Sequence, residues 1–185
     1  MSMDIDDLRV QLAIAQTEHA ASGLRWALRC CELALAALEA GNYGVGAVLL
    51  DEDQNILLES SNAVFSPSFN SAAHAEMQLL ALLDQEVAPV CPRQQMTLVV
   101  SLEPCPMCFC RIISAGIGRV IYLAPDSSGG MASHQDKLPP AWRNLATLTR
   151  VTQFHGDARL SELAAGFANV NRSALREKLL KAMGR

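Results

Sequence analysis

The sequence lacks several features that mark whole classes of proteins. Its longest apolar runs are short and interrupted, which argues against membrane-spanning helices. Six cysteines in 185 residues are too few for a disulfide scaffold, and no N-terminal stretch joins basic residues to an apolar block and a cleavage site. A net charge of −4 and a pI near 5.5 argue against a broad nucleic-acid-binding surface. These absences predict a protein of the reducing cytoplasm.

What the sequence does contain is enough apolar material for a core of useful size. Half of the residues are hydrophobic, and no repeat or compositional break divides the chain, so we predict one domain over residues 1–185. The charge is uneven, because residues 1–18 carry −3 and residues 172–185 carry +4. We interpret the basic end as the solvated face of a helix, which is the usual role of such a run.

Hydrophobic periodicity predicts an alternation of helices and strands. Helical spacing indicates an N-terminal helix over residues 4–19 and a second over 23–40, with Ser22 as its expected N-cap. Apolar runs at 44–50 and 56–60, separated by a polar turn, indicate a β-hairpin. The other predicted elements are a helix over 72–85 with Ser71 as its cap, strands at 96–100, 119–123 and 147–154, a helix from Pro106 to near Gly116, a loop over 125–140, and a C-terminal helical tail over about 157–185 that divides near 169–171. Strands joined through helices predict a largely parallel sheet with helices on both faces.

Two glycines, Gly44 and Gly46, lie in the first strand of the hairpin. A glycine within a strand often marks a place where a ligand or another chain segment approaches the backbone closely. A ligand and simple packing of a helix on the sheet explain this pattern equally well.

The segment Cys105-Pro106-Met107-Cys108 follows a predicted strand and opens a helix. Pro106 suits the first helical position, where its missing N–H costs nothing. The two cysteines are therefore three residues apart in the first turn, with both sulfurs on one side, and the positive helix end favours their thiolate forms. This spacing alone is equally compatible with half of a zinc site, a redox pair, or two buried thiols.

A second helix start supplies partners for these thiols. His74-Ala75-Glu76 opens the predicted helix at 72–85, so His74, Cys105 and Cys108 can meet around one Zn²⁺. Three protein ligands leave the fourth tetrahedral position for water, which is the arrangement of a catalytic rather than a structural zinc site. Glu76 would then lie beside the water without binding the metal, where it can take and deliver protons.

The combined pattern H-x-E…P-C-x-x-C is the established signature of zinc-dependent nucleobase deaminases. Over about residues 22–155 the chain resembles the cytidine deaminase-like superfamily, which implies a three-layer α/β/α fold with a five-stranded mixed sheet. The segments Gly44–Val48, Ala73–Glu76 and Leu102–Cys108 are most similar to the branch that holds guanine deaminases, cytosine deaminases and tRNA adenosine deaminases. The resemblance implies one zinc ion per chain and a homodimer.

The resemblance also implies a set of substrate-binding residues. Asn62 takes the place of an asparagine that hydrogen-bonds the substrate in this branch, although such a residue can also cap its own turn. The full set carried over by the resemblance is Asn62, Val45, Ala75, Ser101, Glu103 and Asp126.

Three functions compete for this site. The first is deamination of a free nucleobase or small nucleoside that is guanine- or cytosine-like, with release of ammonia. The second is deamination of adenosine in tRNA, which the acidic charge opposes because phosphate contacts supply most affinity for nucleic acid. The tRNA enzymes also resemble one another in an Ala-Arg-Asp motif and a Phe- and Arg-rich last helix, where this chain has Ala124-Pro125-Asp126 and Gly166–Arg172. The third is a non-catalytic zinc-stabilised binding protein, which leaves Glu76 unexplained. The sequence therefore favours a small-molecule substrate.

Overall fold

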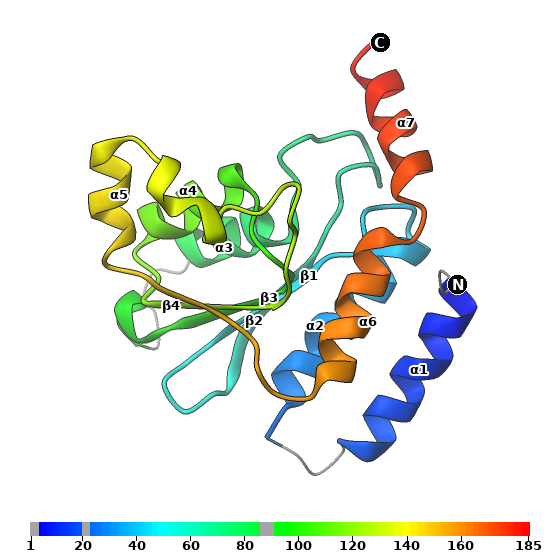
Figure 1. Cartoon of the computed structure of the whole chain (residues 1–185), viewed down its shortest axis with the longest axis horizontal. Helices are drawn as coiled ribbons and strands as arrows, with labels where there is room; N and C mark the ends of the chain where they lie inside the picture. Colours follow the sequence, from blue (N-terminus) through cyan, green and yellow to red (C-terminus); the bar gives the residue numbers. More distant parts are fainter. Residues whose placement is uncertain (1–3, 20–22, 86–90) are drawn as a thin grey trace.

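A five-stranded sheet between helices forms the centre of the computed structural model, which describes residues 4–19, 23–85 and 91–185 (Figure 1). The strand order is β2-β1-β3-β4-β5. The strands are β1 Gly46–Leu50, β2 Ile56–Ser61, β3 Thr97–Leu102, β4 Arg119–Ala124 and β5 Arg150–Gln153. The predicted three-layer architecture with a five-stranded mixed sheet is confirmed.

The expectation of a largely parallel sheet holds for four of the five strands, and β1 is the exception. Strand β1 is antiparallel to both β2 and β3, whereas β3, β4 and β5 are parallel to one another. The crossover from β2 through helix α3 (Ala75–Gln85) does not place β3 beside β2 but on the far side of β1. Because β1 lies between two strands that run in the same direction, it is antiparallel to both. The sequence contains no signal for that insertion.

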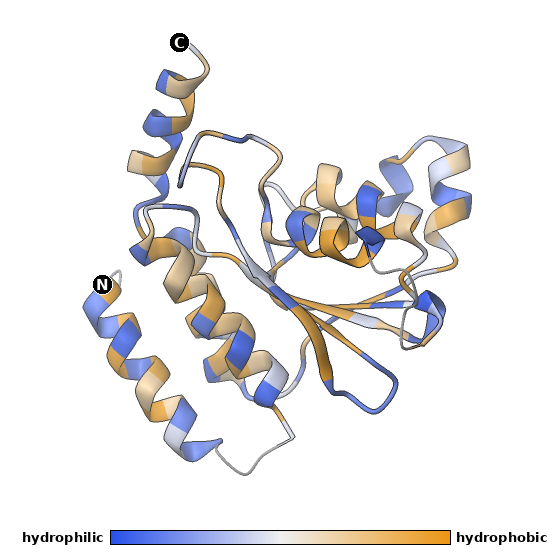
Figure 2. Cartoon of the chain, turned by 180° about the vertical axis from the view of Figure 1, so that it is seen from behind, coloured by the Kyte–Doolittle hydropathy of each residue, from blue (hydrophilic) through white to orange (hydrophobic). Residues whose placement is uncertain are grey.

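The two faces of the sheet are covered by different helices. Helices α2 (Arg25–Glu39) and α6 (Ala158–Asn169) pack on one face, with α1 (Ile5–Glu18) outside them, and α3 and α4 (Pro106–Ala115) pack on the other. Alternate residues of β1 divide accordingly, since Val48 and Leu50 join the first core cluster and Ala47 and Leu49 the second. Figure 2 shows the apolar strands between these layers. Within the described ranges, no helix has the length and apolar character that crossing a bilayer requires.

Helix boundaries follow local signals in some places and not in others. Asp4 caps α1 and forms a reciprocal capping box with Asp7. The predicted cap Ser22 lies outside the described residues, and α2 begins at Arg25 without a side-chain cap. The predicted cap Ser71 is wrong, because α3 begins at Ala75.

The predicted loop over residues 125–140 contains structure that periodicity did not reveal. A 3-10 segment spans Ala132–Lys137, and a short helix α5 follows at Pro140–Ala146. Pro140 stands in the first turn of α5, where proline is tolerated, so the Pro-Pro pair opens a helix here rather than continuing the loop. The C-terminal tail divides as predicted, into α6 and α7 (Arg172–Ala182).

The strand glycines serve helix packing. A Cβ on Gly46 would lie 2.4 Å from the carbonyl oxygen of Cys30 and 2.5 Å from Cβ of Leu33, both on α2. A Cβ on Gly44 would lie 2.3 Å from the carbonyl oxygen of Phe167 on α6. Of the two explanations for these glycines, the structure supports close approach of the helices.

Candidate active site

Three metal-binding side chains meet where two helices begin. His74 directly precedes α3, and Cys105 is the N-cap of α4, with Cys108 one turn further along. The Nδ1 atom of His74 lies 3.7 Å from Sγ of Cys105 and 3.5 Å from Sγ of Cys108. Tetrahedral zinc with ordinary Zn–N and Zn–S bonds requires an N···S separation of about 3.6 Å. The spacing of these side chains therefore fits a zinc ion.

The charges of the thiols point to the same conclusion. Among the protein groups alone, the hydrogen bond from Cys108 lowers the pKa of Cys105 to about 4, with a further contribution from His74. The hydrogen bond to the ionised Cys105 keeps the proton on the thiol of Cys108 and so raises the pKa of Cys108, and burial raises it further. The same partner, Cys105, raises the pKa of His74 through a hydrogen bond. A bound divalent cation would allow both sulfurs to carry charge together.

Glu76 lies beside this cluster in the first turn of α3. The residue is 4 % exposed, and burial raises the pKa of its carboxyl group. It lines the same pocket as His74 and Cys105. Among the described residues, the cluster that could hold a metal ion contains only His74, Cys105 and Cys108, so Glu76 lies next to the cluster and outside it.

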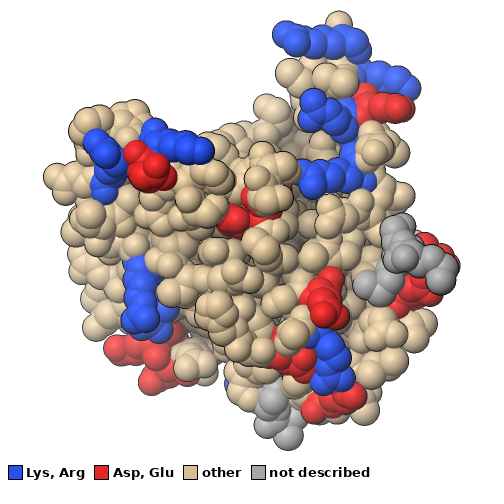
Figure 3. All heavy atoms as spheres, in the orientation of Figure 1, with Lys and Arg blue, Asp and Glu red and all other residues tan. Residues whose placement is uncertain are grey.

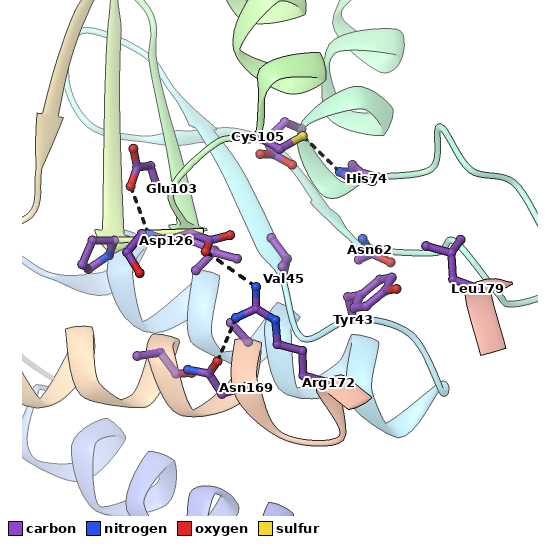
Figure 4. Close-up of a pocket in the computed structure, with 16 residues that line it drawn as sticks. Tyr43, Val45, Asn62, His74, Glu103, Cys105, Asp126, Asn169, Arg172 and Leu179 are labelled. Atoms are coloured by element: carbon purple, nitrogen blue, oxygen red, sulfur yellow. Dashed lines mark hydrogen bonds and ion pairs between the residues drawn. The ribbon is translucent and has the colours of Figure 1, made fainter. Parts of the chain in front are cut away.

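The cluster opens into a pocket of about 360 Å³ (Figure 4). Its walls come from the segment before β1, the ends of β2, β3 and β4, the starts of α3 and α4, and the C-terminal helices. The lining residues are Tyr43, Val45, Asn62, His74, Glu76, Leu102, Glu103, Cys105, Pro125, Asp126, Ser127, Ala165, Ala168, Asn169, Arg172 and Leu179.

Residues 22–124 match the model of the family described as the cytidine and deoxycytidylate deaminase zinc-binding region. The matched segment contains all five fixed residues of the H-x-E…P-C-x-x-C pattern. The chain belongs to this deaminase family.

Individual relatives within the deaminases differ in substrate. The chain is 25% identical over 132 residues to a probable cytosine deaminase of Schizosaccharomyces pombe, covering 71% of this chain and 78% of that protein. It is 36% identical over 107 residues to a tRNA-specific adenosine deaminase of Haemophilus influenzae, covering 58% and 59%. A solved guanine deaminase structure from Nitrosomonas europaea superposes with a TM-score of 0.55 at 25% identity, covering 77% and 84%. Two further curated relatives are matched over only 20% and 24% of their own length.

Four of the six residues predicted to bind substrate line this pocket, namely Val45, Asn62, Glu103 and Asp126. Asn62 also caps its own turn, since its Oδ1 accepts a hydrogen bond from the backbone N–H of Val64 at 3.2 Å. Both roles considered for Asn62 are therefore open to it in one conformation.

The other two predicted residues, Ala75 and Ser101, are fully buried and do not line the pocket. The hydroxyl of Ser101 accepts a hydrogen bond from the backbone N–H of Gly46 at 3.0 Å and so ties β3 to β1. Glu103 reaches the pocket, but its carboxylate is used by the loop after β4, where it accepts bonds from the N–H of Asp126 and from the N–H and hydroxyl of Ser133.

Sequence reasoning missed the part of the pocket that the C-terminal helices supply. Ala165, Ala168 and Asn169 of α6 and Arg172 and Leu179 of α7 all face it. The basic end was interpreted as a solvated helix face, and Arg172 is exposed as that interpretation expects, but it also borders the pocket. The only available signal was the excess of positive charge, which does not say what the charge faces.

Proposed function

We propose that the protein is a zinc-dependent hydrolytic deaminase acting on the exocyclic amine of a free nucleobase or small nucleoside that is guanine- or cytosine-like. One observation carries the proposal: a His-Cys-Cys cluster with zinc spacing shares a pocket with a buried carboxylate. A cluster of three ligands suits a catalytic zinc site, because it leaves a position for water.

The proposed reaction replaces the amine by a carbonyl oxygen. Bound zinc would supply a water of lowered pKa at the open position. Glu76 takes a proton from that water and delivers protons to the ring and to the departing amine, so that a C–O bond forms, the C–N bond breaks and ammonia leaves. Burial of Glu76 raises the pKa of its carboxyl group toward the value that a group which both accepts and donates protons needs.

A deaminase of tRNA adenosine is the second candidate. The relative from Haemophilus influenzae and the basic helix α7 beside the pocket favour it. The acidic overall charge opposes it, because RNA affinity depends on many phosphate contacts. The third candidate, a zinc-stabilised binding protein, is disfavoured because a structural site would normally close its fourth position with another cysteine or histidine.

The proposal includes one zinc ion per chain, a homodimer and a cytoplasmic setting. The zinc count is supported by the single His-Cys-Cys cluster in the described part of the chain. Free thiols at all six cysteines are consistent with a reducing compartment. The homodimer rests on the family resemblance.

The proposal is tested by comparing zinc content and ammonia release in the wild type and in Glu76→Gln. The variant should keep its zinc and lose at least about a hundredfold in kcat, because proton transfer by a positioned group contributes that much or more. Full activity in Glu76→Gln, or wild-type protein that binds no zinc, would overturn the assignment. Substrates for the assay are guanine, cytosine and adenine, their nucleosides, and a tRNA anticodon stem-loop, and turnover of the stem-loop alone would establish the second candidate.

A further inference from the structure

The end of the pocket away from the metal cluster carries a single arginine. Arg172 is the only lysine or arginine among the residues that line the pocket in the described part of the chain. It donates hydrogen bonds to Oγ of Ser128 at 2.7 Å and to Oδ1 of Asn169 at 3.3 Å. Figure 4 shows its guanidinium between Asp126 and Asn169, across the pocket from His74 and Cys105. The side chain is therefore held in position before any ligand arrives.

The neighbours of Arg172 leave some of its N–H donors unused. Asp126 approaches at 3.7 Å, which is an ion pair and too long for a direct hydrogen bond. The two hydrogen bonds to Ser128 and Asn169 use two of the five N–H donors of a guanidinium. Oδ1 of Asp126 also accepts hydrogen bonds from the N–H and hydroxyl of Ser128. A ligand phosphate can thus reach unused donors of Arg172 without displacing its supports.

A second cation lies one helical turn away. The positive charges of Arg176 and Arg172 both act on the hydroxyl of Tyr43, a lining residue, and offset part of the rise in pKa that burial causes there. Arg176 forms no ion pair with any residue that the structure describes. Figure 3 shows the basic side chains gathered along α7.

Helix α7 is anchored where it places these charges. Lys178 donates a hydrogen bond to the carbonyl of Gly41 at 3.1 Å and lies 4.6 Å above the centre of the Phe65 ring. The hydroxyl of Tyr43 donates to the carbonyl of Leu175 at 3.4 Å. The helix is therefore tied to the segment around Tyr43, which lines the pocket.

We propose that this outer end is a phosphate subsite, formed by Arg172 and Arg176, and that the substrate is a nucleoside monophosphate. The inference rests on the proposed deaminase function and changes its substrate from the nucleoside to the corresponding nucleoside monophosphate. Glu76 and the thiols lie at one end of the pocket, and Arg172 with its partner Asp126 lies at the other, so a ring amine and a phosphate would occupy opposite ends. Both arginines lie outside residues 22–124, so the subsite is not part of the family's zinc-binding region.

A nucleotide fits this charge pattern better than an RNA does. Residues 172–185 carry +4, which leaves −8 on the rest of the chain. That excess of negative charge repels an extended polyanion, whereas one phosphate would contact only the basic end. The pocket volume of about 360 Å³ also lies in the range of sites for ligands larger than a bare ring.

The test compares nucleosides with their 5′-monophosphates on zinc-loaded wild type, Arg172→Gln, Arg176→Gln and Lys181→Gln. Lys181→Gln is the matched control, because it removes a charge from the same helix without touching the pocket. We expect the wild type to prefer the monophosphate in kcat/KM. Arg172→Gln should raise KM for the monophosphate about 10- to 100-fold, the range of a charge-assisted hydrogen bond, and change the nucleoside less than about threefold. Arg176→Gln breaks no ion pair within the described part of the protein. It should also raise KM for the monophosphate more than for the nucleoside, but by a smaller factor than Arg172→Gln.

Equal kcat/KM for nucleoside and monophosphate in the wild type, or equal losses for both in the arginine variants, would overturn the phosphate subsite. Turnover of a tRNA stem-loop alone would overturn it as well. Failure of every ring amine to react would count against the proposed deamination, and the subsite is then decided by calorimetric binding of the monophosphates to zinc-loaded Glu76→Gln. Binding that Arg172→Gln abolishes in that background supports the subsite, and binding that it leaves unchanged refutes it.

Discussion

Replacing Glu103 with glutamine should loosen one wall of the pocket while leaving the metal site intact. Glu103 is 4 % exposed and follows β3, directly before the metal-binding segment. One carboxylate oxygen accepts the N–H of Asp126 at 3.0 Å, and the other accepts the N–H and hydroxyl of Ser133 at 3.1 and 3.3 Å. These bonds hold the loop whose residues Pro125, Asp126 and Ser127 line the pocket.

The expected loss of stability follows from the donors that the carboxylate of Glu103 binds. Glutamine has the same shape as glutamate but only one acceptor oxygen, so either the N–H of Asp126 or the donors of Ser133 must face an amide NH₂ group. The variant thereby loses at least one hydrogen bond to a charged acceptor, about 1.5–3 kcal/mol, and leaves a buried donor without a partner. We expect the free energy of unfolding to fall by about 2–4 kcal/mol.

A substitution at Gly130 should disturb the same wall of the pocket, because Gly130 packs against the carboxylate of Glu103. A Cβ at this position would lie 2.2–2.6 Å from the carboxyl atoms of Glu103, which three hydrogen bonds keep from moving. Gly130→Ala should therefore shift the loop as Glu103→Gln does. Gly129→Ala should disturb the loop less, because its Cβ would come within 3 Å of one atom alone, Oδ2 of Asp126, which is not the oxygen that Ser128 holds.

The assay combines urea denaturation at fixed zinc with metal content and steady-state kinetics. Glu103→Gln should keep its zinc and raise KM more than it lowers kcat, because the wall moves while His74 and Glu76 do not. Glu52→Gln, at an exposed position in the turn between β1 and β2, should match the wild type. The reasoning fails if Glu103→Gln costs less than about 0.5 kcal/mol, the scale of an ordinary surface substitution, or if it loses zinc.

Two further changes test the metal centre and the electrostatics of the fold. Cys105→Ala should abolish stoichiometric zinc binding in metal analysis. The variant should also lose the stability that bound zinc adds, which is about 4 kcal/mol where free zinc exceeds Kd a thousandfold. Cys110→Ala is the control and should bind zinc normally, because Cys110 lies outside the ligand cluster. Asp157 caps α6, and hydrogen bonds from Arg159 and then His19 lower the pKa of its carboxyl group. Its contribution to stability is therefore present above the unfolded pKa of about 3.9 and is lost as the pH falls below it. The stability deficit of Asp157→Asn, measured by urea denaturation, should shrink between pH 7 and pH 3, and a deficit independent of pH would contradict this.

The meeting of His74, Cys105 and Cys108 could be predicted from the sequence because its signals are local. Cys105 and Cys108 lie within one helical turn, and His74 and Glu76 lie at the start of another. The predicted set of four needs only that two helix starts meet, which the motif as a whole indicates. Predicted substrate contacts were less successful, and strand parity explains one failure: Ser101 shares its face of β3 with Val99, which packs toward α2 and α6.

The fold was predictable to the extent that each element has its own periodicity. The hairpin, the strands and the long helices lie close to their predicted positions, whereas the place of β1 between β2 and β3 is set by pairing between distant segments. The short helix α5 buries only Ala146, so it has no apolar stripe for periodicity to detect.

The pocket divides into two parts with different relations to the family. Residues 22–124 supply the ligands, Glu76 and the wall formed by Tyr43, Val45 and Asn62. Eight of the sixteen lining residues lie beyond position 124, in the loop after β4 and in helices α6 and α7. A family match that ends at residue 124 thus accounts for the reacting groups but includes only half of the surface that a substrate meets. Relatives that act on cytosine, on guanine and on tRNA can share the first part and differ in the second, so substitutions in residues 125–179 should change substrate preference more than zinc content.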